Sequence, residues 1–121
     1  MAAVERRSQA GRSRSSEAGG RPLAKFVLLT SKAGREAELR EALERTRRAA
    51  RLESATLEWT IHDVPGRPGV VALYELFADA EAAAAHDAAP AVSALVASFD
   101  RLLSDAPVVH VLDVDRRRLD P

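Results

Sequence analysis

Residues 73–90, LYELFADAEAAAAHDAAP, join the end of an apolar strand to a short helix, and this junction indicates the fold. Asp79 has a side chain suited to an N-cap, and Glu81 would follow it in the first helical turn. The sequence therefore predicts a helix over residues 80–87 that carries one histidine, His86. We expect this junction to border a pocket.

Four strands are predicted from the apolar patterns around this stretch. The first is apolar on both faces, which is typical of a central strand. The second alternates, with Leu57, Trp59 and Ile61 on one face. Residues 65–69, PGRPG, then predict a hairpin into the third strand. In chain order the strands span residues 23–30 (LAKFVLLT), 56–64 (TLEWTIHDV), 70–77 (VVALYELF) and 108–114 (VVHVLDV).

Two longer helices are predicted from apolar residues at helical spacing. The first runs from Arg35 to about Leu52, and the second begins at Pro90, a residue suited to the first turn of a helix. The order is β-α-β-β-α-β, so the predicted fold class is α+β, ferredoxin-like, with an antiparallel sheet. The apolar stripe of the second helix comprises Val92, Leu95, Val96, Phe99, Leu102 and Leu103.

The predicted sheet has one face covered by helices and one face without a partner. Because the first and fourth strands are apolar on both sides, a single copy would expose a large apolar patch. Two copies stacked face to face would bury that patch. The pattern therefore predicts a homodimer, which is the arrangement of a dimeric α+β barrel.

The length of 121 residues allows one domain. Residues 1–21 are rich in Arg, Ser and Gly without apolar periodicity, so we expect a disordered basic extension. Residues 22–115 form the predicted domain, and residues 116–121 a flexible tail.

The composition also excludes several classes of partner and site. A net charge of zero argues against nucleic acid or an anionic membrane as the main partner. No apolar run reaches the roughly 20 residues of a membrane helix, and no secretory signal is present, so we expect a cytoplasmic protein. The absence of cysteine excludes disulfides and thiolate chemistry. No metal site is expected, because no local ligand spacing relates His62, His86 and His110.

Residues 23–114 resemble the antibiotic biosynthesis monooxygenase family of dimeric α+β barrel proteins. Members commonly carry a Y-E-x-W/F-x-[SD]-x-E-A-…-H stretch between the third strand and the second helix. They also tend to carry E-x-G-x-x-x-[YW] at the start of the second strand, which Glu53 and Trp59 match, with Ala55 in place of glycine. The first pattern is matched by Tyr74, Glu75, Phe77, Asp79, Glu81, Ala82 and His86.

The resemblance implies a monooxygenase that uses no cofactor and acts on phenols, quinols or anthrone-like aromatics in natural-product or quinone metabolism. The ionised substrate would supply electrons to molecular oxygen, which requires a dry pocket and a base. A haem-degrading function is disfavoured, because the first strand lacks Asn and Phe77 stands where Trp is expected. The alternatives are a non-catalytic dimeric binding protein, a cyclase-like chaperone for an aromatic metabolite, and a subunit that only contacts other proteins.

His86, Tyr74 and Trp59 are the candidate catalytic residues, in a pocket between the sheet and its helices. His86 could accept a phenolic proton. Trp59 and Tyr74 lie on paired strands and could line one wall on which a flat ligand stacks. The structural alternatives are core packing for both aromatic residues, and for His86 a bond to Glu75 or to a backbone carbonyl.

Glu75, Phe77 and Phe26 are the candidate substrate-binding residues. Strand alternation places Glu75 and Phe77 on the face opposite Tyr74. A carboxylate inside a strand needs a partner or solvent, or its pKa rises. We expect Glu75 to bond an arginine or the second subunit, with a role as base as the alternative.

Overall fold

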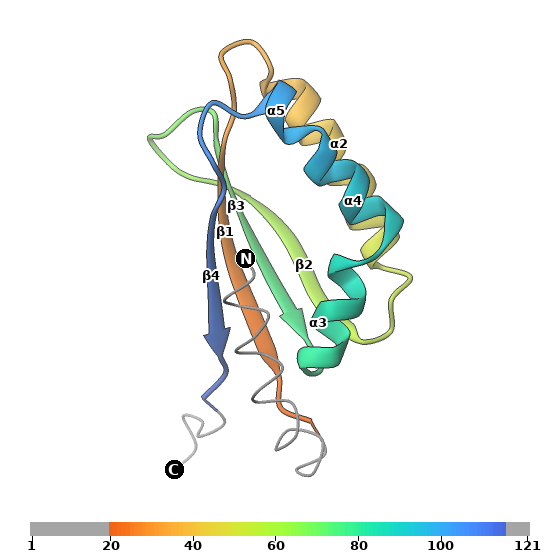
Figure 1. Cartoon of the computed structure of the whole chain (residues 1–121). Helices are drawn as coiled ribbons and strands as arrows, with labels where there is room; N and C mark the ends of the chain where they lie inside the picture. Colours follow the sequence, from red (N-terminus) through yellow and green to blue (C-terminus); the bar gives the residue numbers. More distant parts are fainter. Residues whose placement is uncertain (1–19, 116–121) are drawn as a thin grey trace.

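The computed structural model describes residues 20–115, and in it a four-stranded sheet carries its helices on one side (Figure 1). The predicted α+β order is confirmed, with the bounds of each element close to those expected. The predicted extension and tail lie outside the described residues, apart from Gly20 and Arg21. The elements are β1 (Leu23–Thr30), α2 (Glu36–Ala50), β2 (Thr56–Asp63), β3 (Val70–Phe77), α3 (Ala80–Asp87), α4 (Pro90–Ala97), α5 (Phe99–Leu102) and β4 (Val108–Asp113).

The strands follow the spatial order β2-β3-β1-β4, and each neighbouring pair is antiparallel. This is the ferredoxin-like topology that the element order predicts. The two strands with the most continuous apolar runs, β1 and β3, are central, and each is hydrogen-bonded to a strand on both sides. The predicted hairpin is also confirmed, since Gly66 and Gly69 adopt positive φ angles of 77° and 85° between β2 and β3.

The main core lies between the sheet and helix α2. The apolar stripe of α2 is buried, with Leu39 and Leu43 fully inaccessible to solvent. These side chains pack against odd-numbered residues of the central strands, such as Leu29 and Leu73. A second, smaller cluster joins β1 and β3 to α3, and it comprises Leu23, Phe77 and Ala83.

The last predicted helix is interrupted at Ser98, between α4 and α5. The Ser98 hydroxyl donates a hydrogen bond to the Leu95 carbonyl at 2.6 Å, and its backbone N–H bonds the same oxygen. A serine that bonds a carbonyl in the preceding turn competes with the helical pattern and bends the chain. The apolar stripe continues through the break, because Leu95 and Leu102 are both buried.

The start of β2 departs from strict alternation. A register shift between Thr56 and Glu58 forms a bulge, and Leu57 is 53% exposed. The prediction that Leu57 shares a buried face with Trp59 is therefore wrong, because the extra residue in a bulge disrupts the alternation.

The face of the sheet away from the helices carries apolar side chains that remain accessible. Phe26, Val108 and Leu112 are 36%, 46% and 43% exposed. The Phe26 ring stacks on that of His110, with 6.3 Å between the ring centroids. Among residues 20–115, no helix is long and apolar enough to cross a membrane.

Candidate functional site

Helix α3 lies beside the end of β3 and the start of β2 (Figure 1). Asp79 begins the helix as predicted, because its Oδ1 accepts a hydrogen bond from the Ala82 N–H at 2.8 Å. Only two side chains of α3 are buried, Ala83 and His86. The histidine is therefore the one large group that this helix directs into the protein.

His86 is held between two carboxylates. Its Nδ1 lies 2.8 Å from Glu53 Oε1, and its Nε2 lies 3.9 Å from Glu75 Oε1. Glu53 is itself held by Thr56, whose hydroxyl donates to the same Oε1 at 2.7 Å. Because His86 is only 4% exposed, its ring orientation is set by these groups and not by water.

Lys25 supplies a buried positive charge on the other side of Glu75. It is the direct cross-strand neighbour of Glu75 in the β1–β3 pair, and both residues are 7% exposed. Its Nζ lies 2.6 Å from Asp87 Oδ2 on α3 and 5.7 Å from the centroid of the Phe77 ring. Sequence reasoning missed Lys25, although it is the only charged residue in β1.

Burial raises the pKa of the Glu75 carboxyl above its ordinary value of 4.5. The charges of His86 and Lys25 oppose this rise in pKa, and the Asp87 carboxylate adds to it. The indole N–H of Trp59 also lowers the Glu75 pKa, yet within the described residues Trp59 Nε1 is buried without a hydrogen bond of ordinary geometry. Glu75 is thus a carboxyl group that favours its neutral form more than a solvated one does.

Two aromatic rings complete the surroundings of His86. The Phe77 ring centroid lies 5.1 Å from that of His86, and the Trp59 centroid lies 6.3 Å away. Trp59 is the cross-strand neighbour of Glu75 and is 6% exposed. Two aromatic side chains therefore line this group of polar residues. We name the group the buried polar cluster, and it comprises Glu53, Glu75, His86, Lys25 and Asp87.

The structure separates the predicted site residues into two groups. Trp59 and His86 lie on the helix side of the sheet with Glu75 and Phe77. Tyr74 pairs with Thr60 and Phe26, on the opposite face. The prediction that Trp59 and Tyr74 line one wall is wrong, because the β2–β3 register pairs Trp59 with Glu75 and so turns it away from Tyr74. The separation of Tyr74 from Glu75 and Phe77 is confirmed.

The neighbours of Glu75 differ in part from those expected. Its proximity to His86 is one of the alternatives stated for that histidine, and a bond to the second subunit stays a prediction. Within residues 20–115 its charged neighbours are His86, Lys25 and Asp87 rather than an arginine. Sequence reasoning did not assign Glu53 a role, although it matches the family pattern at the start of β2. Its link to His86 spans 33 residues, so no local spacing reveals it.

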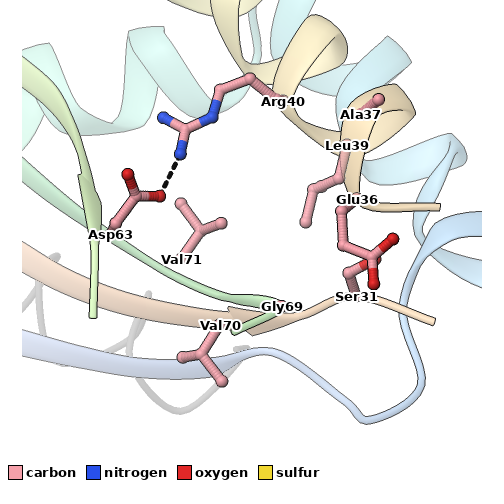
Figure 2. Close-up of a pocket in the computed structure, with 9 residues that line it drawn as sticks. All are labelled: Ser31, Glu36, Ala37, Leu39, Arg40, Asp63, Gly69, Val70 and Val71. Atoms are coloured by element: carbon pink, nitrogen blue, oxygen red, sulfur yellow. Dashed lines mark hydrogen bonds and ion pairs between the residues drawn. The ribbon is translucent and has the colours of Figure 1, made fainter. Parts of the chain in front are cut away.

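A hollow of about 220 Å³ lies away from this cluster, between α2 and the sheet. Figure 2 shows Leu39 and Val71 facing it, with an ion pair between Arg40 and Asp63 at its edge. A second hollow of about 210 Å³ lies between α2 and α4 and is lined mainly by small residues. Neither hollow is lined by Trp59, Tyr74 or His86.

The buried polar cluster can move protons. A neutral imidazole accepts one proton, and a carboxyl whose pKa is raised by burial keeps its proton to a higher pH than a solvated one does. Lys25 favours an anion placed near it. Within the described part of the chain, no group of three or more His, Asp or Glu residues could hold a metal ion.

Comparisons with known proteins show that the chain has a known fold. A protein of unknown function from Nitrosomonas europaea is 30% identical, with a TM-score of 0.72 over 84% of this chain and 96% of that one. A candidate antibiotic biosynthesis monooxygenase from Caulobacter crescentus is 19% identical, with a TM-score of 0.76 over 80% of this chain and 92% of that one. Another antibiotic biosynthesis monooxygenase is 17% identical, with a TM-score of 0.72 over 77% of this chain and 98% of that one. No family model matches the chain, and no curated protein does.

Proposed function

Because the chain has the fold of the antibiotic biosynthesis monooxygenase family, we propose that it is a cofactor-independent monooxygenase acting on a phenol, quinol or anthrone-like aromatic. The observation that carries the proposal is His86, buried with its two ring nitrogens facing Glu53 and Glu75. A fixed, water-shielded base of this kind suits the removal of a proton from an aromatic substrate.

In the proposed reaction His86 takes the acidic proton, and the ionised substrate gives its electrons to molecular oxygen. For an anthrone, one ring CH₂ and one O₂ become a quinone carbonyl and one water, so no further reductant is needed. Lys25 supports the anionic form through its buried positive charge. Trp59 and Phe77 offer aromatic surfaces for a flat ring.

The attachment of α3 supports a route for substrate access. Its only buried side chains are Ala83 and His86, so little apolar surface holds it to the sheet. Its polar contacts to the rest of the domain include His86 with Glu53 and Asp87 with Lys25. We propose that α3 swings away from the sheet to admit the ring, and that Trp59 then becomes accessible.

A non-catalytic binding protein for an aromatic metabolite is the second candidate. The observation that favours it is the closure of the site: Trp59 and His86 are 6% and 4% exposed, and neither hollow described above reaches them. A binder needs the aromatic walls but no proton acceptor, so the two candidates differ in their dependence on His86.

We also propose that the protein is a homodimer formed through the open face of the sheet. The accessible Phe26, Val108 and Leu112 would be buried by a second copy. In this arrangement Tyr74 and Phe26 serve the interface, while the His86 site is separate from it. The cytoplasmic location stays a prediction from composition.

The direct test is oxygen consumption by the purified full-length chain with a panel of anthrones and naphthoquinols, without added metal or flavin. We expect acceleration over buffer, a fall of about 100-fold in kcat for His86→Ala, and little change for the exposed control His62→Ala. No acceleration across the panel, together with tight quenching of Trp59 fluorescence, would instead support the binding protein. Full activity in His86→Ala would refute His86 as the base.

A further inference from the structure

Glu53 connects the buried His86 ring to solvent. It lies in the loop between α2 and β2, with Oε1 at 2.8 Å from His86 Nδ1. Its side chain is 28% exposed, whereas that of His86 is 3% exposed. The Thr56 hydroxyl donates to the same oxygen and fixes the carboxylate in this position. One carboxylate therefore contacts both the buried ring and water.

We infer that Glu53 is the positioning residue of this site: it holds His86 as the tautomer with the proton on Nδ1 and relays protons between the ring and solvent. The inference rests on the proposed function, in which His86 is the base. It adds Glu53 as the residue that determines which ring nitrogen of His86 carries the lone pair and acts as the base.

The tautomer follows from the chemistry of the contact. An ionised carboxylate only accepts hydrogen bonds, so the contact with Glu53 requires a proton on Nδ1. Nε2 then carries the lone pair and points into the protein, toward Glu75 at 3.9 Å. Without Glu53, Glu75 is the carboxyl group that remains beside the ring, and a ring proton on Nε2 would leave the lone pair on Nδ1, facing the place of Glu53.

The other charged groups around the ring are less suited to connect it to water. Glu75 on β3 and Lys25 on β1 are each 7% exposed. Asp87 on α3 has a side chain that is 38% exposed, but its carboxylate is paired with Lys25 at 2.6 Å and not with the ring. From β2, the Trp59 indole faces the site but does not titrate. Glu53 is the member of the buried polar cluster that touches both His86 and solvent.

The relay balances one proton at each step. Nε2 takes the substrate proton and forms an imidazolium, which lies between two carboxylates. The Nδ1 proton then passes to Glu53 and on to water, which leaves a neutral ring protonated on Nε2. When Nε2 gives that proton to the reduced oxygen, Glu53 returns one proton from water to Nδ1 and restores the first tautomer.

The test is the tautomer of His86, read from long-range proton–nitrogen NMR spectra of the full-length protein at neutral pH. We expect the proton on Nδ1 in the wild-type chain and on Nε2 in Glu53→Ala. The exposed carboxylate variant Glu58→Ala is the matched control and should keep the wild-type tautomer. Thr56→Val, which keeps Glu53 but removes its anchor, should give a mixture. A wild-type ring protonated on Nε2, or an unchanged tautomer in Glu53→Ala, would overturn the inference.

The second readout is kinetic and separates this inference from the proposed function. With an active substrate, Glu53→Ala should lower kcat by about 100-fold with little change in KM, and added formate should restore part of the rate. A loss confined to KM would contradict the relay. A protein inactive on every substrate that still shows the expected tautomer change would refute the oxygenase and support the positioning role of Glu53.

Discussion

Replacing Lys25 by methionine should destabilise the domain in a way that depends on pH. The side chains have similar length, so the change removes a buried charge while filling most of the space. Two carboxylates lose a partner. Asp87, with its side chain 38% exposed, can be hydrated, but Glu75 is 7% exposed and cannot. Glu75 therefore bears most of the cost.

The expected loss in the free energy of unfolding follows from this difference in exposure between Asp87 and Glu75. Breaking a buried ion pair costs about 3–5 kcal/mol when one charge is left without a partner. Because Asp87 can turn to water, we expect Lys25→Met to lower the free energy of unfolding by about 2–3 kcal/mol at about pH 8.

The pH dependence has a defined sign. Lys25 lowers the pKa of Glu75, so without it the folded-state pKa rises further above the ordinary 4.5. At a pH between the pKa of Glu75 in the unfolded chain and its higher pKa in the folded protein, the folded state binds more protons than the unfolded state. Stability contributed by the protonated carboxyl is therefore lost as pH rises through that window. The loss in Lys25→Met should be smaller at about pH 5 than at about pH 8.

The assay is urea denaturation followed by fluorescence of Trp59, the only tryptophan, at one fixed protein concentration. Lys32→Met is the matched control, because Lys32 is the only other lysine and is exposed; its effect should stay within about 0.5 kcal/mol. The double variant Lys25→Met/Glu75→Gln should recover at least half of the loss at about pH 8. Equal losses at both pH values, or a double variant that loses the sum of the single effects, would refute the coupling of Lys25 to Glu75.

Two further predictions address the interface and the helix that carries the histidine. Phe26→Glu places a charge on the open face of the sheet and should convert a dimer into a folded monomer, as measured by light scattering with circular dichroism; a variant that stays dimeric would exclude this face as the interface. Asp79→Ala removes the N-cap of α3 and should lower the free energy of unfolding by about 1 kcal/mol in the urea assay, with Asp105→Ala on an exposed loop as the neutral control. An equal effect of both substitutions would contradict the capping role.

The elements of this fold could be predicted because each depends on residues close together in the chain. The apolar spacing of α2 predicts a helix whose Leu39 and Leu43 are buried, as observed. Asp79 bonds a backbone N–H only three residues away, and Pro90 stands at the first turn of α4. The break at Ser98 escaped prediction, because the stripe of apolar residues passes through it without interruption.

The grouping of site residues could be predicted only in part. Alternation within β3 separates Tyr74 from Glu75 whatever the rest of the chain does. The side of the sheet on which Trp59 lies depends instead on the register between β2 and β3 and on the bulge near Thr56. A shift of one residue would turn Trp59 to the other face.

By itself the sequence determined the order of strands and helices, the turn between β2 and β3, and the helix on which His86 lies, since these features rest on local spacing and capping. Only the tertiary structure decided what surrounds His86. Its contact with Glu53 spans 33 residues, and the contact of Lys25 with Asp87 spans 62. Such contacts arise once β1 and β3 pair and α3 folds back onto the sheet. The buried polar cluster is therefore a product of packing, and no periodicity of the chain encodes it.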